Sequence, residues 1–233
     1  MNLYFPEPYE DEILYSTIAR YHYYVGNNNT KYTIRELFGT EAIIPTIELT
    51  SNLKKFCKYI GNSIYNLDYF INKHTNLPFY APFLKLDNRV NIREMMINSD
   101  GKGIYAKIGI TAGGICTKRG LYYCPQCVIE DVKNVGEAYF HRIHQVPGVL
   151  VCPTHSCLIK QYKITRNNIG RINFIKLNLR YIDNNIHYMD NTIISNYLVK
   201  IANSAKYILN SDLNKFNQLS ITKKYKTILN EKG

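Results

Sequence analysis

Features that mark several large classes of protein are missing from this sequence of 233 residues. No apolar run approaches the roughly 20 residues that a membrane-spanning helix needs, so the sequence predicts no membrane contact. Residues 1–8 contain neither a basic region nor a long apolar stretch. The sequence therefore predicts that there is no signal peptide and that the protein is cytoplasmic.

Local signatures of common enzyme active sites are also missing. There is no GxxxxGK[ST] phosphate-binding loop, no GxGxxG after a strand, no HExxH and no GxSxG. Asp68, Asp87 and Asp131 could meet in space as a metal-dependent nuclease site, but no local pattern indicates one. The sequence therefore predicts a protein that is not an enzyme.

Acidic residues are scarce in the last third of the chain. Residues 160–233 contain 13 Lys and Arg against 4 Asp and Glu, whereas residues 1–159 contain 16 against 14. A basic segment beside a neutral one favours a polyanionic partner, usually nucleic acid. The alternative is compositional drift, because the chain is rich in Lys, Asn, Ile and Tyr throughout.

Hydrophobic residues make up 45% of the chain, enough for one large or two small domains with a core. A first helix is predicted from apolar residues at helical spacing, which are Leu14, Ile18, Tyr21 and Val25. Residues 26–29 end it. Thr33 and Glu36 have capping-box spacing, and Gly39 can close a second helix. Two such helices can form an N-terminal helix-turn-helix, although an ordinary helical hairpin has the same pattern.

Further helices are predicted over residues 53–60, 64–71, 90–96, 194–208 and 219–229. Residues 171–179 partly alternate apolar and polar side chains, which predicts a strand. The predicted fold class is mainly α, with a small zinc-organised Cys3His insert and a minor β element. We expect a helical N-terminal region (1–110), a zinc-finger region (111–160) and a basic, mainly helical C-terminal region (161–233).

Two short cysteine motifs predict a metal site. Cys124 and Cys127 form a CxxC pair, and Cys152 and His155 form a CxxH pair, with 24 residues between the two pairs. Each pair places two ligands on a tight turn, and together they complete a tetrahedral shell that suits one structural Zn²⁺ per chain. A redox CxxC needs no distant CxxH partner, and no thioredoxin-like βαβ pattern surrounds this one.

The other cysteines and histidines fit this pattern less well. Cys57 lies on an apolar helix face and is interpreted as a core residue. Cys116 and Cys157 lie near the shell but lack the spacing. His141 and His144 form an HxxH between the two pairs. They could bind a second metal, or pack and hydrogen-bond around the first.

Four separated blocks resemble the TnsD/TniQ family of transposon target-site selectors. They are FPEPYEDEILYSTIARY (5–21), RELFG (35–39), HTNLPFYAPF (74–83), and YCPQC (123–127) running through GEAYFHRIHQVPG (136–148) to CPTH (152–155). The resemblance covers residues 3–158 in order and is closer to the TnsD branch than to the shortest TniQ proteins. It places the family's zinc ligands on Cys124, Cys127, Cys152 and His155.

The resemblance implies a non-catalytic protein that recognises target DNA directly, or through an RNA-guided complex. Such a protein recruits the transposon's AAA+ ATPase regulator, which brings the transposase, in a bacterial cytoplasm. Two departures stand out. Many members have Trp in the block around Tyr139 and Phe140, whereas this chain has none. TnsD-branch members are also longer, so we expect this chain to correspond to an N-terminal portion.

We therefore predict a target-site selector that contacts double-stranded DNA, the ATPase and possibly other transposition proteins. The alternatives are a zinc-stabilised nuclease or recombination enzyme, and a plain protein–protein zinc module. DNA phosphates are expected to contact basic residues of the C-terminal segment, of the zinc region and of the second helix. These are Lys223, Lys224 and Lys226, Lys118 and Arg119, and Lys31 and Arg35.

A selector without chemistry of its own also needs a protein-binding surface. The first predicted helix turns Leu14, Ile18 and Tyr21 toward the core, which leaves Tyr15 and Tyr23 on other faces. Tyrosines are common interface anchors because they bury a large ring and keep a polar tip. We expect Tyr15 and Tyr23 to help dock the ATPase, although they could equally cover a neighbouring helix.

Overall fold

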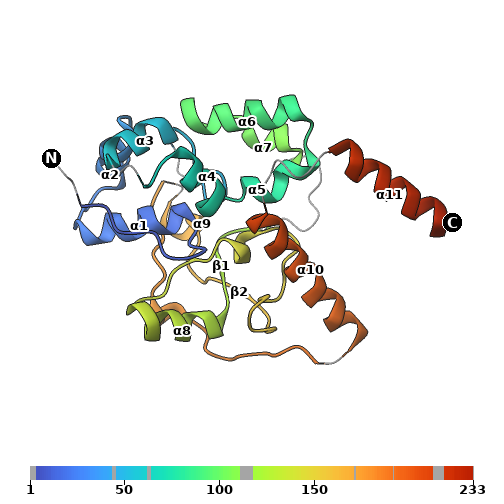
Figure 1. Cartoon of the computed structure of the whole chain (residues 1–233). Helices are drawn as coiled ribbons and strands as arrows, with labels where there is room; N and C mark the ends of the chain where they lie inside the picture. Colours follow the sequence, from blue (N-terminus) through green and yellow to red (C-terminus); the bar gives the residue numbers. More distant parts are fainter. Residues whose placement is uncertain are drawn as a thin grey trace.

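The computed structural model describes residues 4–43, 46–61, 64–110, 118–170, 172–190, 192–211 and 218–232. The protein is mostly helical with a small two-stranded sheet, which confirms the predicted fold class (Figure 1). The first half comprises α1 (Leu14–Tyr24), α2 (Thr30–Phe38), α3 (Leu53–Ile60), α4 (Leu67–His74), α5 (Leu77–Tyr80), η1 (Ala81–Phe83), α6 (Leu86–Asn98) and α7 (Ile104–Ile108).

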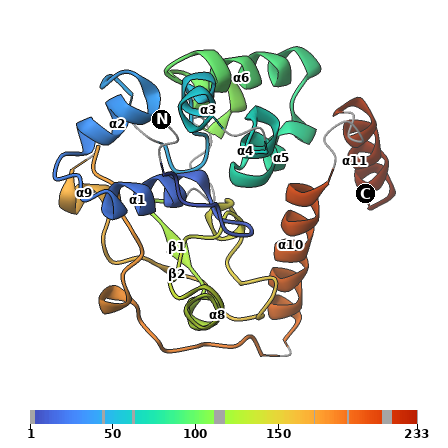
Figure 2. The ribbon, with the colours of Figure 1, turned by 60° about the vertical axis from the view of Figure 1, so that its left-hand side comes forward.

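The second half holds the sheet and the longest helices. Its elements are β1 (Tyr122–Tyr123), α8 (Pro125–Val135), η3 (Ile143–Gln145), β2 (Lys160–Gln161), α9 (Arg166–Ile169), η4 (Leu179–Tyr181), α10 (Ile193–Asn210) and α11 (Gln218–Lys232). β1 and β2 pair antiparallel, with Tyr123 opposite Lys160. Helix α10 runs from α4 and α5 down beside η3, and α11 stands out to one side (Figures 1 and 2).

Helix α1 is buried along most of its length. The predicted core residues Leu14, Ile18 and Tyr21 are buried, whereas Val25 caps the helix and is partly exposed. Helix α2 starts earlier than predicted, because the Asn29 side chain caps it by accepting the backbone N–H of Lys31. The predicted capping box at Thr33 is therefore wrong. Gly39 ends α2 in the left-handed conformation, as predicted.

The predicted strand over residues 171–179 does not form among residues 172–179. The segment is extended and buries Phe174, Ile175 and Leu177. Two of its backbone N–H groups donate hydrogen bonds to tyrosine hydroxyls. Ile175 N donates to the Tyr15 hydroxyl and Asn178 N donates to the Tyr162 hydroxyl, each at 3.0 Å. Because tyrosines satisfy this backbone, no second strand is needed beside it.

Helix α10 buries a narrower face than its apolar spacing suggests. Ala202, Ala205 and Leu209 are buried, whereas Ile194 and Ile201 are exposed. The remaining core includes one continuous cluster that extends from Ile13 to Leu177, so residues of all three predicted regions pack together. The boundaries between those regions stay a prediction. Within the described parts of the chain, no helix combines the length and apolarity required to cross a membrane.

Candidate metal centre

The first pair of cysteines stands at the start of α8. Cys124 is the N-cap of this helix, Pro125 occupies its first turn, and the sulfur of Cys124 accepts the backbone N–H of Cys127 at 3.4 Å. Proline suits this position because its missing N–H would have no helical partner there. The positive end of the helix dipole favours thiolates at both cysteines.

The second pair lies on a tight turn that brings its ends together. Ser156 N donates to Cys152 O and Cys152 N donates to Cys157 O, each at 2.8 Å. Ser156 adopts a positive φ of 49°, which closes the turn after His155. The structure therefore folds CxxC as a helix start and CxxH as a turn, rather than as two matching knuckles.

All four predicted ligands meet in one place. His155 Nδ1 lies 3.5 Å from the sulfur of Cys124, 3.3 Å from that of Cys127 and 3.6 Å from that of Cys152. The sulfurs of Cys127 and Cys152 are 3.7 Å apart. Tetrahedral zinc ligands lie about 3.6 Å apart for a sulfur–nitrogen pair and about 3.8 Å for two sulfurs. The spacing and the soft donor set both fit a zinc ion.

The other ring nitrogen of His155 is held by a carboxylate. His155 Nε2 lies 3.0 Å from Glu130 Oε1, one turn along α8 from the cysteines. A metal-binding histidine ordinarily uses its second nitrogen in this way, which fixes the ring orientation and the tautomer. Glu130 is a site residue that the sequence reasoning missed; its position three residues after Cys127 was the available signal.

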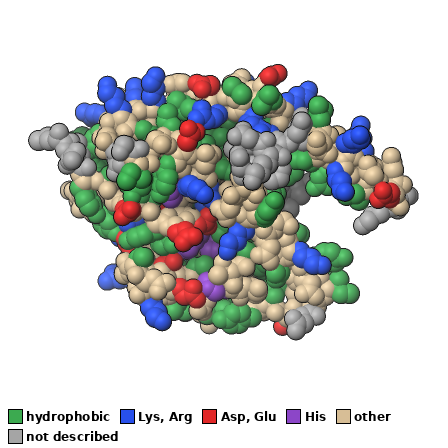
Figure 3. All heavy atoms as spheres, in the orientation of Figure 1, with side chains coloured by type: hydrophobic (Ala, Val, Ile, Leu, Met, Phe, Trp, Pro, Cys, Tyr) green, Lys and Arg blue, Asp and Glu red, His purple; other side chains and the backbone are tan. Residues whose placement is uncertain are grey.

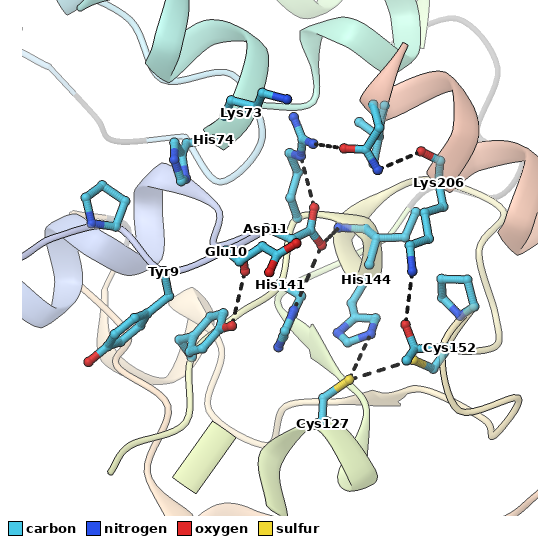
Figure 4. Close-up of a pocket in the computed structure, with 18 of the residues that line it drawn as sticks. Tyr9, Glu10, Asp11, Lys73, His74, Cys127, His141, His144, Cys152 and Lys206 are labelled. Atoms are coloured by element: carbon cyan, nitrogen blue, oxygen red, sulfur yellow. Dashed lines mark hydrogen bonds and ion pairs between the residues drawn. The ribbon is translucent and has the colours of Figure 1, made fainter. Parts of the chain in front are cut away.

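Two more donors crowd the same place. His144 joins Cys124, Cys127 and Cys152 in a buried group whose ligand atoms all lie within 4.8 Å of one another. Figure 4 shows His144 beside the sulfur of Cys127. The sulfur of Cys157 is buried and lies 3.3 Å from that of Cys124. A Cys3His group able to hold a metal is therefore present, and the spacing rule did not single out these extra donors. Cys116 lies outside the described residues.

His141, the other histidine of the HxxH, does not join the thiols. Its Nε2 lies 3.0 Å from Asp131 Oδ2, and its Nδ1 lies 3.9 Å from Asp11 Oδ2. Burial lowers the pKa of His141, but the hydrogen bond to Asp131 and the two carboxylate charges outweigh it, so the pKa lies above its ordinary value. His141 thus links α8 to the N-terminal segment, and the two roles that the sequence left open for it stay predictions.

A cavity of about 720 Å³ opens beside the cysteines. It lies between the N-terminal segment, the Cys152 turn and α10, and Figure 4 shows Asp11, His144 and Lys206 along its wall. Arg142 crosses one side of it. This guanidinium donates to Asp11 and to the carbonyl oxygens of Asn72 and Thr75, so it ties the N-terminal segment to α4.

The N-terminal block is fixed by a buried ion network. Arg20 Nη1 donates to Glu12 Oε2 at 2.7 Å, and its Nε donates to Glu137 Oε1 at 2.9 Å. Glu12 is fully buried, and Arg20 nearly so. The Tyr9 ring lies 3.8 Å from the guanidinium carbon. This network joins residues 5–21 to residues 136–148, two of the blocks on which the resemblance rests.

The predicted DNA-contacting residues do not form one patch. Lys223, Lys224 and Lys226 are exposed on α11, whose blue side chains Figure 3 shows at the right. Lys31 and Arg35 are exposed on α2, where Arg35 pairs with Glu41. Arg119 is exposed.

Lys118 differs from the others. Its ammonium group donates to His144 O and lies near the ring of Tyr122. Burial lowers its pKa to about 7, although the charge of Glu48 opposes this shift. Lys118 is therefore engaged with the protein itself, and its contact with phosphates stays a prediction.

The structure adds a basic patch that the sequence reasoning missed. Lys54, Lys55 and Lys58 are exposed along α3, which packs against α2. Lys and Arg side chains gather at this edge of the molecule, at the upper left in Figure 3. The helix over residues 53–60 was predicted from its apolar residues alone. The three lysines on its polar face were the signal that could have indicated this patch.

The two tyrosines proposed as partner anchors lie in different environments. Tyr15 is fully buried, and its hydroxyl bonds to the backbone of Asn173 and Ile175. It cannot anchor a partner in this conformation, so that prediction is wrong. Tyr23 is 54% exposed, and its ring borders a cavity of about 550 Å³ beside Phe174 and Tyr181. It remains available to a partner.

Comparison with known proteins agrees with this arrangement. A family model described as TniQ matches residues 3–159, which contain the ion network and the metal centre. The chain is 30% identical over 156 residues to the transposon Tn7 transposition protein TnsD of Escherichia coli. That match covers 66% of this chain but only 31% of the relative's length. The resemblance to this family is therefore confirmed, and the chain belongs to the TniQ family.

Proposed function

We propose that this protein selects target sites for DNA transposition and does not itself catalyse strand chemistry. It contacts double-stranded DNA, or a targeting complex on DNA, and recruits an AAA+ ATPase regulator. The observation that carries the proposal is the match of residues 3–159 to the TniQ family, together with the relative named as a transposition protein. The match covers less than a third of that relative, so its activity as a whole protein is not transferred here.

The charge distribution supports contact with DNA. Two exposed lysine groups stand on different helices: Lys54, Lys55 and Lys58 on α3, and Lys223, Lys224 and Lys226 on α11. Neutralising a phosphate releases bound cations, which makes the affinity for DNA fall with salt. Lys31 and Arg35 are exposed on α2, the helix that packs against α3.

Fluorescence anisotropy of a labelled 30-base-pair duplex tests DNA binding and assigns the surface. We expect the affinity to fall steeply between 50 and 200 mM salt. Changing three lysines of one group to Gln should flatten the slope of log K against log salt by roughly 0.9 for each lost phosphate contact. If only the α3 triple variant does so, α3 with α2 contacts the DNA; if only the α11 variant does so, α11 contacts it. If neither variant changes the slope, both surfaces are excluded.

The metal centre is proposed to hold one zinc ion through Cys124, Cys127, Cys152 and His155. Bound there, the ion would be structural: it would join the start of α8 to the Cys152 turn, and these four donors complete its shell. Metal analysis of freshly purified, reduced protein should find about one zinc per chain. A protein prepared in this way that contains no zinc would exclude the assignment.

A nucleic-acid enzyme is the competing function. Two acids near the metal centre are engaged in ion pairs, Asp131 with His141 and Asp11 with Arg142. Incubation of pure protein with supercoiled plasmid and magnesium distinguishes the two functions. We expect no nicked product; nicking that disappears in a variant of this chain would favour the enzyme.

The exposed side of α1 and its surroundings are the proposed partner surface. Tyr23 borders the cavity lined by Phe174, Leu179 and Tyr181, and Leu179 and Tyr181 are themselves partly exposed. An aromatic residue at the edge of such a hollow is a common interface anchor. We propose that the ATPase regulator contacts this surface.

A further inference from the structure

His144 lies beside the same three thiols as His155. Its Nε2 is 3.9 Å from the sulfur of Cys127, and a ring nitrogen of His144 lies within 4.8 Å of all three cysteine sulfurs. A tetrahedral site takes four ligands. Beside the thiols of Cys124, Cys127 and Cys152, the two imidazoles provide one nitrogen more than the site can use at one time, and the Cys157 thiol, 3.3 Å from that of Cys124, is a further donor.

The second ring nitrogens distinguish the two histidines. His155 Nε2 lies 3.0 Å from Glu130, whereas His144 Nδ1 is buried and has no hydrogen-bond partner among the described residues. A histidine that ordinarily binds metal uses its second nitrogen to fix the ring. His155 is therefore the ordinary ligand. The ring of His144 is not held by a comparable hydrogen bond at its second nitrogen.

The positions of the two side chains differ as well. The side chain of His155 is 13% exposed and that of its partner Glu130 is 46% exposed, so solvent reaches this pair. His144 is enclosed in η3, where Gln145 N donates to Arg142 O and Lys118 donates to His144 O. Solvent can compete for the His155 contacts but not for the position of His144.

We propose that His144 is a reserve ligand of the metal centre. When His155 is displaced or lost, His144 Nε2 takes its place beside Cys124, Cys127 and Cys152. His144 Nε2 lies 3.9 Å from the sulfur of Cys127, and a ring nitrogen of His144 lies within 4.8 Å of the other two sulfurs, so a shift on the order of 1 Å reaches the tetrahedral sulfur–nitrogen spacing of about 3.6 Å. This proposal rests on the metal centre proposed above.

The exchange would also change what the centre is attached to. His155 belongs to a turn at the surface, whereas His144 follows Arg142 and Ile143, which both bond to Asp11 of the N-terminal segment. With His144 as the fourth ligand, the metal would connect the three cysteines to η3, and through η3 to Asp11 in the N-terminal segment. The metal centre would therefore stay connected to the N-terminal segment when His155 is lost.

Metal affinity in the full chain tests the proposal. The wild type, His155→Ala, His144→Ala and the double variant are titrated against a chromophoric zinc chelator and then loaded with Co²⁺ for absorption spectra. His141→Ala is the matched control, since His141 bonds Asp131 rather than the thiols. We expect each single variant to hold one zinc. His155→Ala should bind it roughly 10- to 100-fold more weakly than the wild type, the usual cost of one supporting contact at a metal site.

The double variant gives the decisive comparison. We expect it to lose zinc at chelator concentrations that leave both single variants loaded, and we expect Co²⁺ in His155→Ala to keep a spectrum typical of three sulfurs and one nitrogen. The variant His155→Gln, whose folding is checked by circular dichroism, serves as a second test of the same position. If both His155→Ala and a folded His155→Gln are metal-free, the proposal is overturned. Equal affinity of His155→Ala and the double variant, with a four-sulfur Co²⁺ spectrum, would assign the role to Cys157 instead. A wild type without zinc would overturn the metal centre itself.

Discussion

Removing the guanidinium of Arg20 should expose how strongly the buried ion network holds the fold. In the variant Arg20→Met, Glu12 stays fully buried and keeps only neutral donors, from Ser16 Oγ at 2.8 Å and Tyr9 N at 3.1 Å. Breaking one side of a buried ion pair costs about 3–5 kcal/mol, because a charge is left uncompensated. That is a large part of the 5–15 kcal/mol that typically separates folded from unfolded protein.

The loss should depend on pH in a defined direction. Burial raises the pKa of Glu12 above its ordinary value, and Arg20 opposes this shift. Without Arg20 the pKa rises further, so the carboxyl group is neutral in the folded state at low pH and costs little there. As pH rises through the folded-state pKa, the buried group must ionise and stability is lost. The difference in unfolding free energy between wild type and Arg20→Met should therefore be larger at pH 8 than at pH 5.

Urea unfolding followed by circular dichroism at the two pH values measures both effects. Arg93→Met is the matched control, because Arg93 pairs with Asp68 at the surface and such pairs are worth about 0–1 kcal/mol. The double variant Glu12→Gln/Arg20→Met removes both charges and should recover part of the loss. A loss below about 1 kcal/mol for Arg20→Met, or one that is equal at both pH values, would refute the reasoning.

Three further predictions concern other parts of the molecule. Tyr23→Ala should lower recovery of the cognate ATPase in a pull-down with ATP while leaving melting temperature and zinc content unchanged, and undiminished recovery would exclude Tyr23 as an anchor. Gly136→Ala should lower the melting temperature by roughly 2–8 °C, because Gly136 ends α8 at φ 82° and a left-handed residue with a Cβ costs about 1–2 kcal/mol. Gly136→Asn should lower the melting temperature less. An Ala variant as stable as the wild type would contradict the prediction. Burial raises the pKa of Glu48 to about 7, against the opposing effects of Tyr80 and Lys118. The wild type should therefore lose about 1–2 kcal/mol more unfolding free energy between pH 5 and pH 8 than the variant Glu48→Gln loses. Equal pH profiles of the two proteins in thermal unfolding would refute the assignment.

Much of this fold follows from local sequence patterns. Apolar spacing and Gly61 predict α3 within its observed bounds, and Gly39 ends α2 where it was expected. The four proposed metal ligands could be singled out because CxxC and CxxH restrict the backbone locally, and in the structure His155 Nδ1 lies within 3.6 Å of all three cysteine sulfurs. Such features need no knowledge of distant contacts.

Features set by tertiary contacts could not be predicted in this way. The strand expected over residues 171–179 is replaced by an extended segment, because Tyr15 and Tyr162 reach its backbone from distant positions. Tyr15 was expected at the surface, and its hydroxyl is used inside the core instead. His144 enters the metal centre because η3 places it there, although no ligand spacing points to it. Each outcome depends on which segment packs against which.

Loading of the AAA+ ATPase onto DNA tests the central claim most directly. Biotinylated duplex on beads is incubated with the cognate ATPase and ATP, with and without the zinc-loaded chain, at low salt. The proposed function predicts that the chain binds the DNA and increases the amount of ATPase retained, and that the Cys152→Ser variant increases it less. Equal retention of ATPase with and without a folded, DNA-bound chain would contradict the claim that this protein recruits the ATPase to its target.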